Sequence, residues 1–201
     1  DHLRIAANGD STGRLMTYDP VSRKVTVLLK GLSFANGVAL SKDRDYVLVA
    51  ETSRQLIQRY WLKGLQATTH EVFAQVPGSP DNIKINDRGQ FWVALNNGRS
   101  FPSFIDDIVA VRLDEHGRIL ERRHGNGFMQ SISEVKEIRG TLFVGSVVCL
   151  RIPYFKSCSM QYAHRKSYSS GVMKREIPLV KFAIRLISQD TLTPSIVAIS
   201  S

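Results

Sequence analysis

The sequence predicts an all-β fold of the β-propeller type, on three observations. Short β-branched and aromatic runs are separated by Gly, Asn, Asp and Pro, which is typical of strands joined by turns. Up to residue 148, no segment has the period of an amphipathic helix. A unit of several strands also recurs about every 45 residues, as propeller blades do. A β-sandwich with evenly spaced hairpins is the alternative, but the units repeat in residue type as well as in spacing, which favours the propeller.

The first strand of each unit begins at a polar residue and leads into a tight turn. Asn36 and Asp81 open the first two of these strands and lie 45 residues apart, and Glu134 opens the third. The predicted strands are 36–40, 81–85 and 134–138, with turns at 43–45, 87–89 and 139–140.

The later strands of each unit repeat in the same order. Second strands are predicted at 46–50, 91–94 and 142–145, third strands at 13–19, 58–63 and 108–114, and a further strand at 25–29. Trp61 and Trp92 occupy similar places in successive units, so we expect both in the core between blades.

The length of the chain limits how much of a propeller it can form. It has 201 residues, and three units are visible between residues 13 and 148. A closed propeller needs at least four blades, and commonly about six. We therefore expect an incomplete propeller of about three to four blades over residues 1–148, followed by an irregular tail.

The tail, residues 149–201, differs from the rest in charge and pattern. The chain has a net charge of +9, and residues 151–201 contribute +6 of it. They match none of the repeats, so we interpret the tail as a basic segment foreign to the fold, from a mis-predicted exon or read-through. Two dibasic pairs, Arg165-Lys166 and Lys174-Arg175, come without a recognition motif, so we expect no nucleic-acid partner. No apolar run is long enough to cross a membrane as a helix.

The repeated residues resemble those of the plant strictosidine synthase-like proteins. The resemblance covers about residues 9–148 and rests on segments 13–20, 25–41, 49–52, 59–64, 77–83, 133–135 and 140–146. It implies a six-bladed propeller related to the lactonases and gluconolactonases, with blades missing before residue 9 and after residue 148. It also implies a secretory location, in the endoplasmic reticulum, the vacuole or the cell exterior.

The candidate site lies where the innermost strands begin, because propellers place function at their axis. Asn36 and Asp81 fall on two positions that are metal ligands in the related lactonases and gluconolactonases. Their oxygens suit calcium, although two oxygens cannot hold an ion that takes six to eight. Asn-Gly and Pro-Asp are also strong turn formers, so a purely structural role for both residues is the alternative.

The family's condensation of an amine with an aldehyde, a step in alkaloid biosynthesis, needs a general base, which is a glutamate in the true synthase. The resemblance places Ser133 at that position, and a serine hydroxyl has no useful basicity near neutral pH. Glu134 is one residue along, which in a regular strand means the opposite face. The axial candidates are thus Asn36, Asp81, Ser133 and Glu134, with no catalytic base identified.

Two functions follow as hypotheses. The first is calcium-assisted hydrolysis of a small-molecule ester or lactone in a full-length parent, with Asn36 and Asp81 as ligands. The second is a non-catalytic propeller fragment or binding scaffold.

Overall fold

The computed structural model describes residues 10–96, 107–125, 132–146, 152–156, 159–163 and 195–199. These residues form strands and turns, and no helix long and apolar enough to cross a membrane occurs among them. The strands are β1 (Gly13–Asp19), β2 (Lys24–Leu32), β3 (Ala35–Leu40), β4 (Tyr46–Glu51), β5 (Leu56–Trp61), β6 (His70–Gln75), β7 (Pro80–Ile85), β8 (Phe91–Leu95), β9 (Ile108–Leu113), β10 (Ile119–His124), β11 (Ile132–Ile138), β12 (Thr141–Ser146), β13 (Ile152–Lys156), β14 (Ser159–Ala163) and β15 (Ser195–Ile199).

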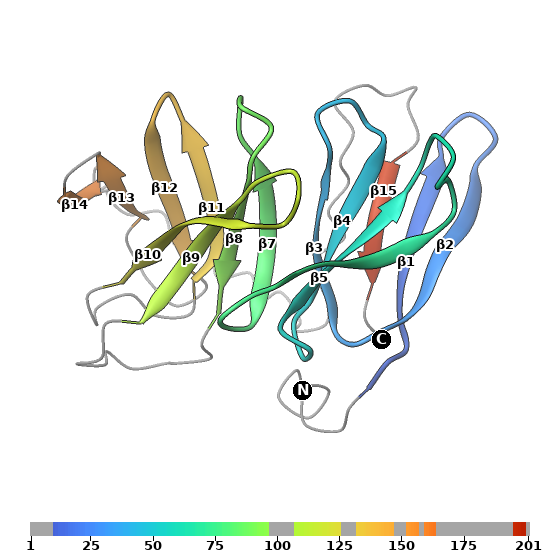
Figure 1. Ribbon diagram of the computed structural model, residues 1–201, viewed down its shortest axis with the longest axis horizontal. Helices are drawn as coiled ribbons and strands as arrows, with labels where there is room; N and C mark the ends of the chain where they lie inside the picture. Colours follow the sequence, from blue (N-terminus) through green and yellow to red (C-terminus); the bar gives the residue numbers. More distant parts are fainter. Residues whose placement is uncertain are drawn as a thin grey trace, which may run out of the picture.

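The strands form four antiparallel sheets that stand side by side (Figure 1). Sheet A has three strands in the order β15-β1-β2. Sheets B, C and D each have four strands in chain order: β3 to β6, β7 to β10 and β11 to β14. Neighbouring inner strands, β3 with β7 and β7 with β11, lie next to each other. The fold is therefore all-β and a partial propeller, which confirms the predicted fold class.

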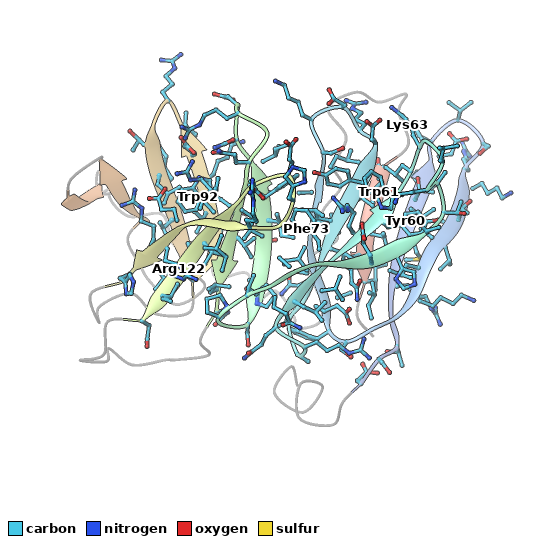
Figure 2. The ribbon with its side chains drawn as sticks, viewed as in Figure 1. Tyr60, Trp61, Lys63, Phe73, Trp92 and Arg122 are labelled. Atoms are coloured by element: carbon cyan, nitrogen blue, oxygen red, sulfur yellow. The ribbon has the colours of Figure 1, made fainter. Side chains whose placement is uncertain are left out.

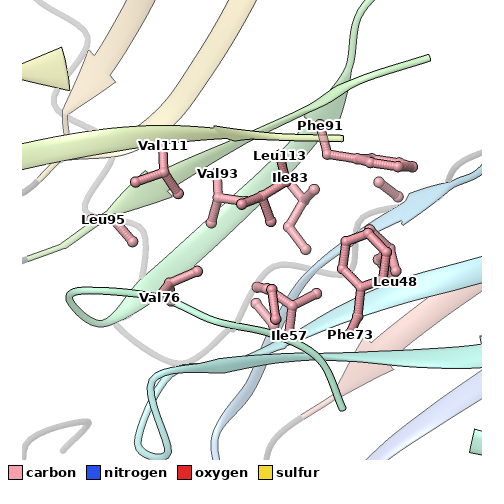
Figure 3. Packing of buried hydrophobic residues seen from close by; sticks show 13 residues of the cluster. Leu48, Ile57, Phe73, Val76, Ile83, Phe91, Val93, Leu95, Val111 and Leu113 are labelled. Carbon is pink, nitrogen blue, oxygen red and sulfur yellow. The ribbon is translucent and has the colours of Figure 1, made fainter. Parts of the chain in front are cut away.

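The second strand in sheets B and C contains a continuous apolar run because both of its faces are buried. On β4, Val47 and Val49 pack toward sheet A, and Leu48 and Ala50 pack toward sheet C. Successive side chains of a strand point to opposite faces, and here each face packs into a different core. Figure 3 shows the core between sheets B and C, where Phe73, Leu48 and Ile57 face Phe91, Val93 and Leu113. Burying each such side chain stabilises the fold by about 1.5–3 kcal/mol.

The segment 149–201 contributes strands, which corrects the expectation of an irregular tail. β13 and β14 complete sheet D, and β15 pairs with β1 in sheet A, at the far end of the chain (Figure 1). Ile196 and Ala198 of β15 are buried against the core shared with sheet B. The interpretation of 149–201 as a mis-predicted exon stays a prediction.

β15 occupies the position of a second strand in sheet A. Its Val197-Ala198 pair matches a Val-Ala or Val-Gly pair at the same place in the second strands, namely Val49-Ala50, Val93-Ala94 and Val144-Gly145. Ala198 lies opposite Leu15 on β1, as Ala50 lies opposite Ile57 on β5. β15 therefore carries part of the repeat, which the sequence analysis did not find in this segment.

The two tryptophans, both labelled in Figure 2, differ in burial. Trp92 is buried between sheets C and D, as predicted. Trp61 is partly exposed, and the Arg59 guanidinium stacks on it, 4.5 Å from the ring centroid. The prediction of a core position is therefore wrong for Trp61, because its indole Nε1 donates to the exposed Glu71 side chain at 3.1 Å and its ring contacts the Arg59 guanidinium.

Candidate functional site

Each innermost strand is interrupted near its first residue by a β-bulge. The register slips by one residue between Ala35 and Val38 on β3, between Pro80 and Ile83 on β7, and between Ile132 and Glu134 on β11. A bulge inserts one unpaired residue and turns nearby side chains away from the regular alternation, and bulges are common beside active sites. The three bulges are the structural basis of the candidate site.

The pairing around the bulges shows which residues are equivalent. Ala35, Pro80 and Ile132 pair with the residues at the ends of β4, β8 and β12, and Val38, Ile83 and Val135 pair two residues earlier. Asn36, Asp81 and Ser133 are therefore equivalent, and Glu134 is equivalent to Gly37 and Asn82. This corrects the repeat analysis, which aligned Glu134 with Asn36 and Asp81.

Asn36 is held by a hydroxyl that also reaches the next sheet. The Asn36 amide Nδ2 donates to Thr52 Oγ1 at 3.3 Å. Thr52 Oγ1 in turn donates to the carbonyl oxygen of Pro80 at 2.7 Å. Pro80 immediately precedes Asp81, so the contact ties the bulge of sheet B to the bulge of sheet C.

Asp81 has an equivalent partner in its own sheet. Asn96 follows β8, as Thr52 follows β4, and Asn96 Nδ2 donates to Asp81 Oδ2 at 3.3 Å. Each sequence-predicted ligand therefore forms a hydrogen bond with the residue that follows the second strand of its sheet. Asn36 donates to Thr52, and Asp81 accepts from Asn96. The two bulged ends are built in the same way.

The inner strands approach each other closely at the bulges. A Cβ on Gly37 would lie 2.5 Å from Asn82 Cα and 2.5 Å from the Asp81 carbonyl oxygen, so only glycine fits. On the other side of β7, Asn82 Nδ2 donates to the carbonyl oxygen of Ser133 at 2.7 Å. The structure thus brings Asn36, Asp81 and Ser133 onto three adjoining strands.

The side chain of Glu134 contacts the neighbouring inner strand, β7. Its Oε2 lies 3.7 Å from Lys84 Nζ on β7, and both side chains are largely buried. Gly145 lies opposite on β12, where a Cβ would come within 3.0 Å of Glu134 Cβ. The carboxylate of Glu134 therefore faces an ammonium group at the edge of the site.

A buried carboxylate anchors the loop that precedes Asn36. Glu51 is 0% exposed and accepts the backbone N–H of Ser33 at 2.7 Å and Nε2 of Gln58 at 2.9 Å. Arg54 Nη1 adds an ion pair at 3.3 Å. A buried charge is tolerated only with such partners, so Glu51 holds the backbone beside the bulge of β3.

The oxygen atoms at the bulges are of the types that bind a hard cation such as calcium. Among the described residues, no group of three or more His, Cys, Asp or Glu gathers to hold a metal. Calcium also takes amide and hydroxyl oxygens and backbone carbonyls, and those are the groups at the bulges. Asn36 and Asp81 would supply its side-chain ligands, and the rest of six to eight oxygens would come from other groups.

The described part of the chain also has a polar cavity at the opposite ends of the inner strands. It measures about 390 Å³ and lies between the turns that follow β3, β7 and β9. Its charged lining residues are Lys42, Asp43, Asp45, Arg88, Asp114 and Glu115. None of the sequence-predicted site residues lines this cavity.

Thr52, Asn96 and Glu51 were missed by the sequence analysis. Thr52 and Asn96 lie 44 residues apart, close to the 45 that separate Asn36 from Asp81. A polar residue directly after each second strand is therefore the signal that could have identified the first two. Glu51 has no such signal, because the equivalent residues are Leu95 and Ser146.

Comparison with protein families gives a match to the strictosidine synthase model over residues 3–65. Strictosidine synthase-like protein 10 of Arabidopsis thaliana is 42% identical over 178 residues, covering 73% of this chain and 47% of that protein. Strictosidine synthase-like protein 2 of the same plant is 42% identical over 185 residues, covering 73% and 49%. The chain spans about half the length of the curated relatives it matches.

Solved structures share the fold at low sequence identity. A gluconolactonase from Xanthomonas campestris superposes with a TM-score of 0.54 at 17% identity, over 75% of this chain and 44% of that one. Regucalcin, a calcium-binding protein from Agrobacterium tumefaciens, has a TM-score of 0.54 at 20% identity, over 71% and 48%.

Proposed function

The chain belongs to the strictosidine synthase-like family, and from that premise we propose that the protein binds calcium at the bulged ends of β3 and β7 and hydrolyses a small-molecule ester or lactone there. The observation that carries the proposal is the pair of equivalent bulges. They bring an amide, Asn36, and a carboxylate, Asp81, to adjoining inner strands, each oriented by a neighbouring side chain.

Condensation of an amine with an aldehyde is not supported by the residues at the third bulge. The position expected for a basic glutamate is Ser133, and it is also the position equivalent to Asn36 and Asp81. A serine hydroxyl does not remove a proton near neutral pH without a separate base. Glu134 is paired with Lys84, which competes with a substrate amine for the carboxylate.

Calcium-assisted hydrolysis can use the residues that are present at the bulges of β3 and β7. A bound calcium ion would polarise the ester carbonyl and stabilise the developing negative charge. Asn36 and Asp81 would hold the ion, and the close approach at Gly37 would keep their strands together. The likeness in fold to a gluconolactonase and to a calcium-binding protein supports this by analogy only.

The test is hydrolysis of 4-nitrophenyl acetate and of glucono-δ-lactone by the purified protein, with calcium chloride and then with a chelator. We expect turnover that the chelator abolishes and that Asp81→Asn lowers at least about tenfold, because the variant loses a charged ligand. Asp87→Asn is the matched control, since Asp87 is an exposed carboxylate at the other end of β7. Turnover that is indifferent to the chelator would reject the proposal.

The second candidate is a binding scaffold without catalysis. It is favoured by the absence, within the described residues, of a three-member acidic, His or Cys group and of an identified base. Calcium binding without hydrolysis of either substrate class would select it over the enzyme.

A further inference from the structure

The residues that follow the second strands form the same backbone contact in sheets B and C. The N–H of Thr52 donates to the carbonyl oxygen of Phe34 at 3.1 Å, and the N–H of Asn96 donates to that of Ser79 at 2.8 Å. Phe34 and Ser79 each lie two residues before the polar bulge residue of the inner strand. Both contacts therefore fix the backbone from which the side chains of Thr52 and Asn96 reach the bulge.

The hydroxyl of Thr52 determines which way the Asn36 amide points. A hydroxyl has one proton to donate, and that of Thr52 is used on the Pro80 carbonyl oxygen at 2.7 Å. Toward Asn36 the hydroxyl can therefore only accept, so the amide must present Nδ2 to it. The amide oxygen, Oδ1, is then turned away from Thr52.

Asn96 orients Asp81 by donating a hydrogen bond, whereas Thr52 orients Asn36 by accepting one. An ionised carboxylate only accepts hydrogen bonds, so Asn96 must present Nδ2 to Asp81 Oδ2, as it does at 3.3 Å. This donor holds one oxygen of the carboxylate and thereby limits rotation of its plane. The two partners differ because the groups that they orient differ: an acceptor faces the amide and a donor faces the carboxylate.

We infer that Thr52 and Asn96 are positioning residues for the calcium ligands, an inference that rests on the proposed function. They orient Asn36 Oδ1 and the Asp81 carboxylate without touching the ion. Thr52 has a second task, because its bond to Pro80 joins the strand that carries Asn36 to the strand that carries Asp81. A change in either residue therefore alters affinity for the ion while leaving the ligands themselves in the chain.

The first measurement is calorimetric titration of the purified protein with calcium chloride. Thr52→Val keeps the shape but removes the hydroxyl, and we expect it to weaken binding about three- to tenfold, the effect of one neutral hydrogen bond. Thr52→Ser keeps the hydroxyl and is expected to bind as the wild type does. Thr69→Val is the matched control, because its hydroxyl donates to the Gln66 carbonyl oxygen at 2.7 Å in a loop outside the site.

The second measurement needs no calcium. In the metal-free protein, the side-chain amide signal of Asn36, identified by its loss in Asn36→Ala, is expected to shift in Thr52→Val and to stay in place in Thr52→Ser and Thr69→Val. Wild-type affinity together with an unshifted amide in Thr52→Val would overturn the inference. Absence of binding by the wild type would instead overturn the calcium site, and the amide signal then decides separately whether Thr52 orients Asn36.

Discussion

Glu137 on β11 and Trp92 on β8 form a hydrogen bond between two neighbouring sheets. The indole Nε1 of Trp92 donates to Glu137 Oε2 at 2.9 Å. The same carboxylate accepts Nδ2 of Asn86 at 2.8 Å and Nη2 of Arg88 at 3.0 Å, both from the hairpin between β7 and β8. One side chain of sheet D thus collects three donors of sheet C, beside the apolar core that these sheets share.

Removing this carboxylate is expected to destabilise the contact between sheets C and D. We predict that Glu137→Ala lowers the free energy of unfolding by about 2–3 kcal/mol, because hydrogen bonds to a charged group are lost and buried donors are left unpaired. Urea denaturation measures the loss. Glu115→Ala, which removes an exposed carboxylate from the turn after β9, should stay within about 0.5 kcal/mol of the wild type. Equal effects of the two variants would contradict the assignment.

The charge of Glu137 also predicts a pH dependence of stability. Burial raises the pKa of Glu137, but donation by Asn86 and Trp92 and the charges of Arg88 and Arg112 outweigh burial, so the pKa lies below its usual value. A lowered folded-state pKa contributes stability above the unfolded-state pKa of about 4.3, and the contribution is lost as the pH falls through the folded-state pKa.

The matched variant for this pH dependence is Glu137→Gln, which keeps an acceptor oxygen and removes the charge. The stability difference between wild type and variant should be full at pH 6 and shrink steadily below about pH 4.3. A difference that stays constant from pH 7 to pH 3 would show that the carboxylate charge has no part in the contact.

Comparing alanine variants of Gly117 and Gly64 separates the effect of steric fit from that of backbone strain. Both have a positive φ, 81° and 78°, but a Cβ on Gly117 would collide with the carbonyl oxygen of Phe73, whereas nothing lies within 4 Å of one on Gly64. We predict a loss of about 1–2 kcal/mol for Gly64→Ala, from strain alone, and of more than about 3 kcal/mol for Gly117→Ala. Thermal or urea denaturation checks this, and similar losses would mean that the turn after β9 does not pack on sheet B.

The position of β15 is tested by a charge placed in its middle. Val197 is 7% exposed and Ile199 is 37% exposed, on the same short strand. Val197→Asp should destabilise the fold by about 3 kcal/mol or more and speed amide hydrogen exchange in β1, while Ile199→Asp should do much less. Unchanged exchange in β1 with Val197→Asp would mean that β15 does not pair there.

The repeat was predictable from sequence because its signal is the pattern of apolar residues. Both faces of β4 and β8 are buried, so their middle residues appear as continuous apolar runs, and the turn between β7 and β8 has a glycine, Gly89, at its positive φ. Trp61 was misplaced because residue type alone does not show that Arg59 lies on its ring. β15 was missed because one strand of a unit, without its neighbours, is too short to recognise.

The candidate site was predictable in part. Asn36 and Asp81 stand out as polar residues at strand starts, whereas the bulges depend on pairing between strands and leave no mark in spacing. Only the pairing of β11 with β12 around the bulge shows that Ser133, and not Glu134, is equivalent to Asn36 and Asp81. Thr52 and Asn96 act through hydrogen-bond direction, which only the arrangement of donors and acceptors reveals.

The most direct test of the account is a crystal structure of the protein soaked in calcium chloride, with anomalous data to identify the ion. The account predicts an ion at the bulged ends of β3 and β7, about 2.3–2.6 Å from Asn36 Oδ1 and from an oxygen of Asp81. An ion held instead among Asp43, Asp45 and Asp114 at the opposite ends of the strands, or no ion at the bulges at saturating calcium, would contradict it.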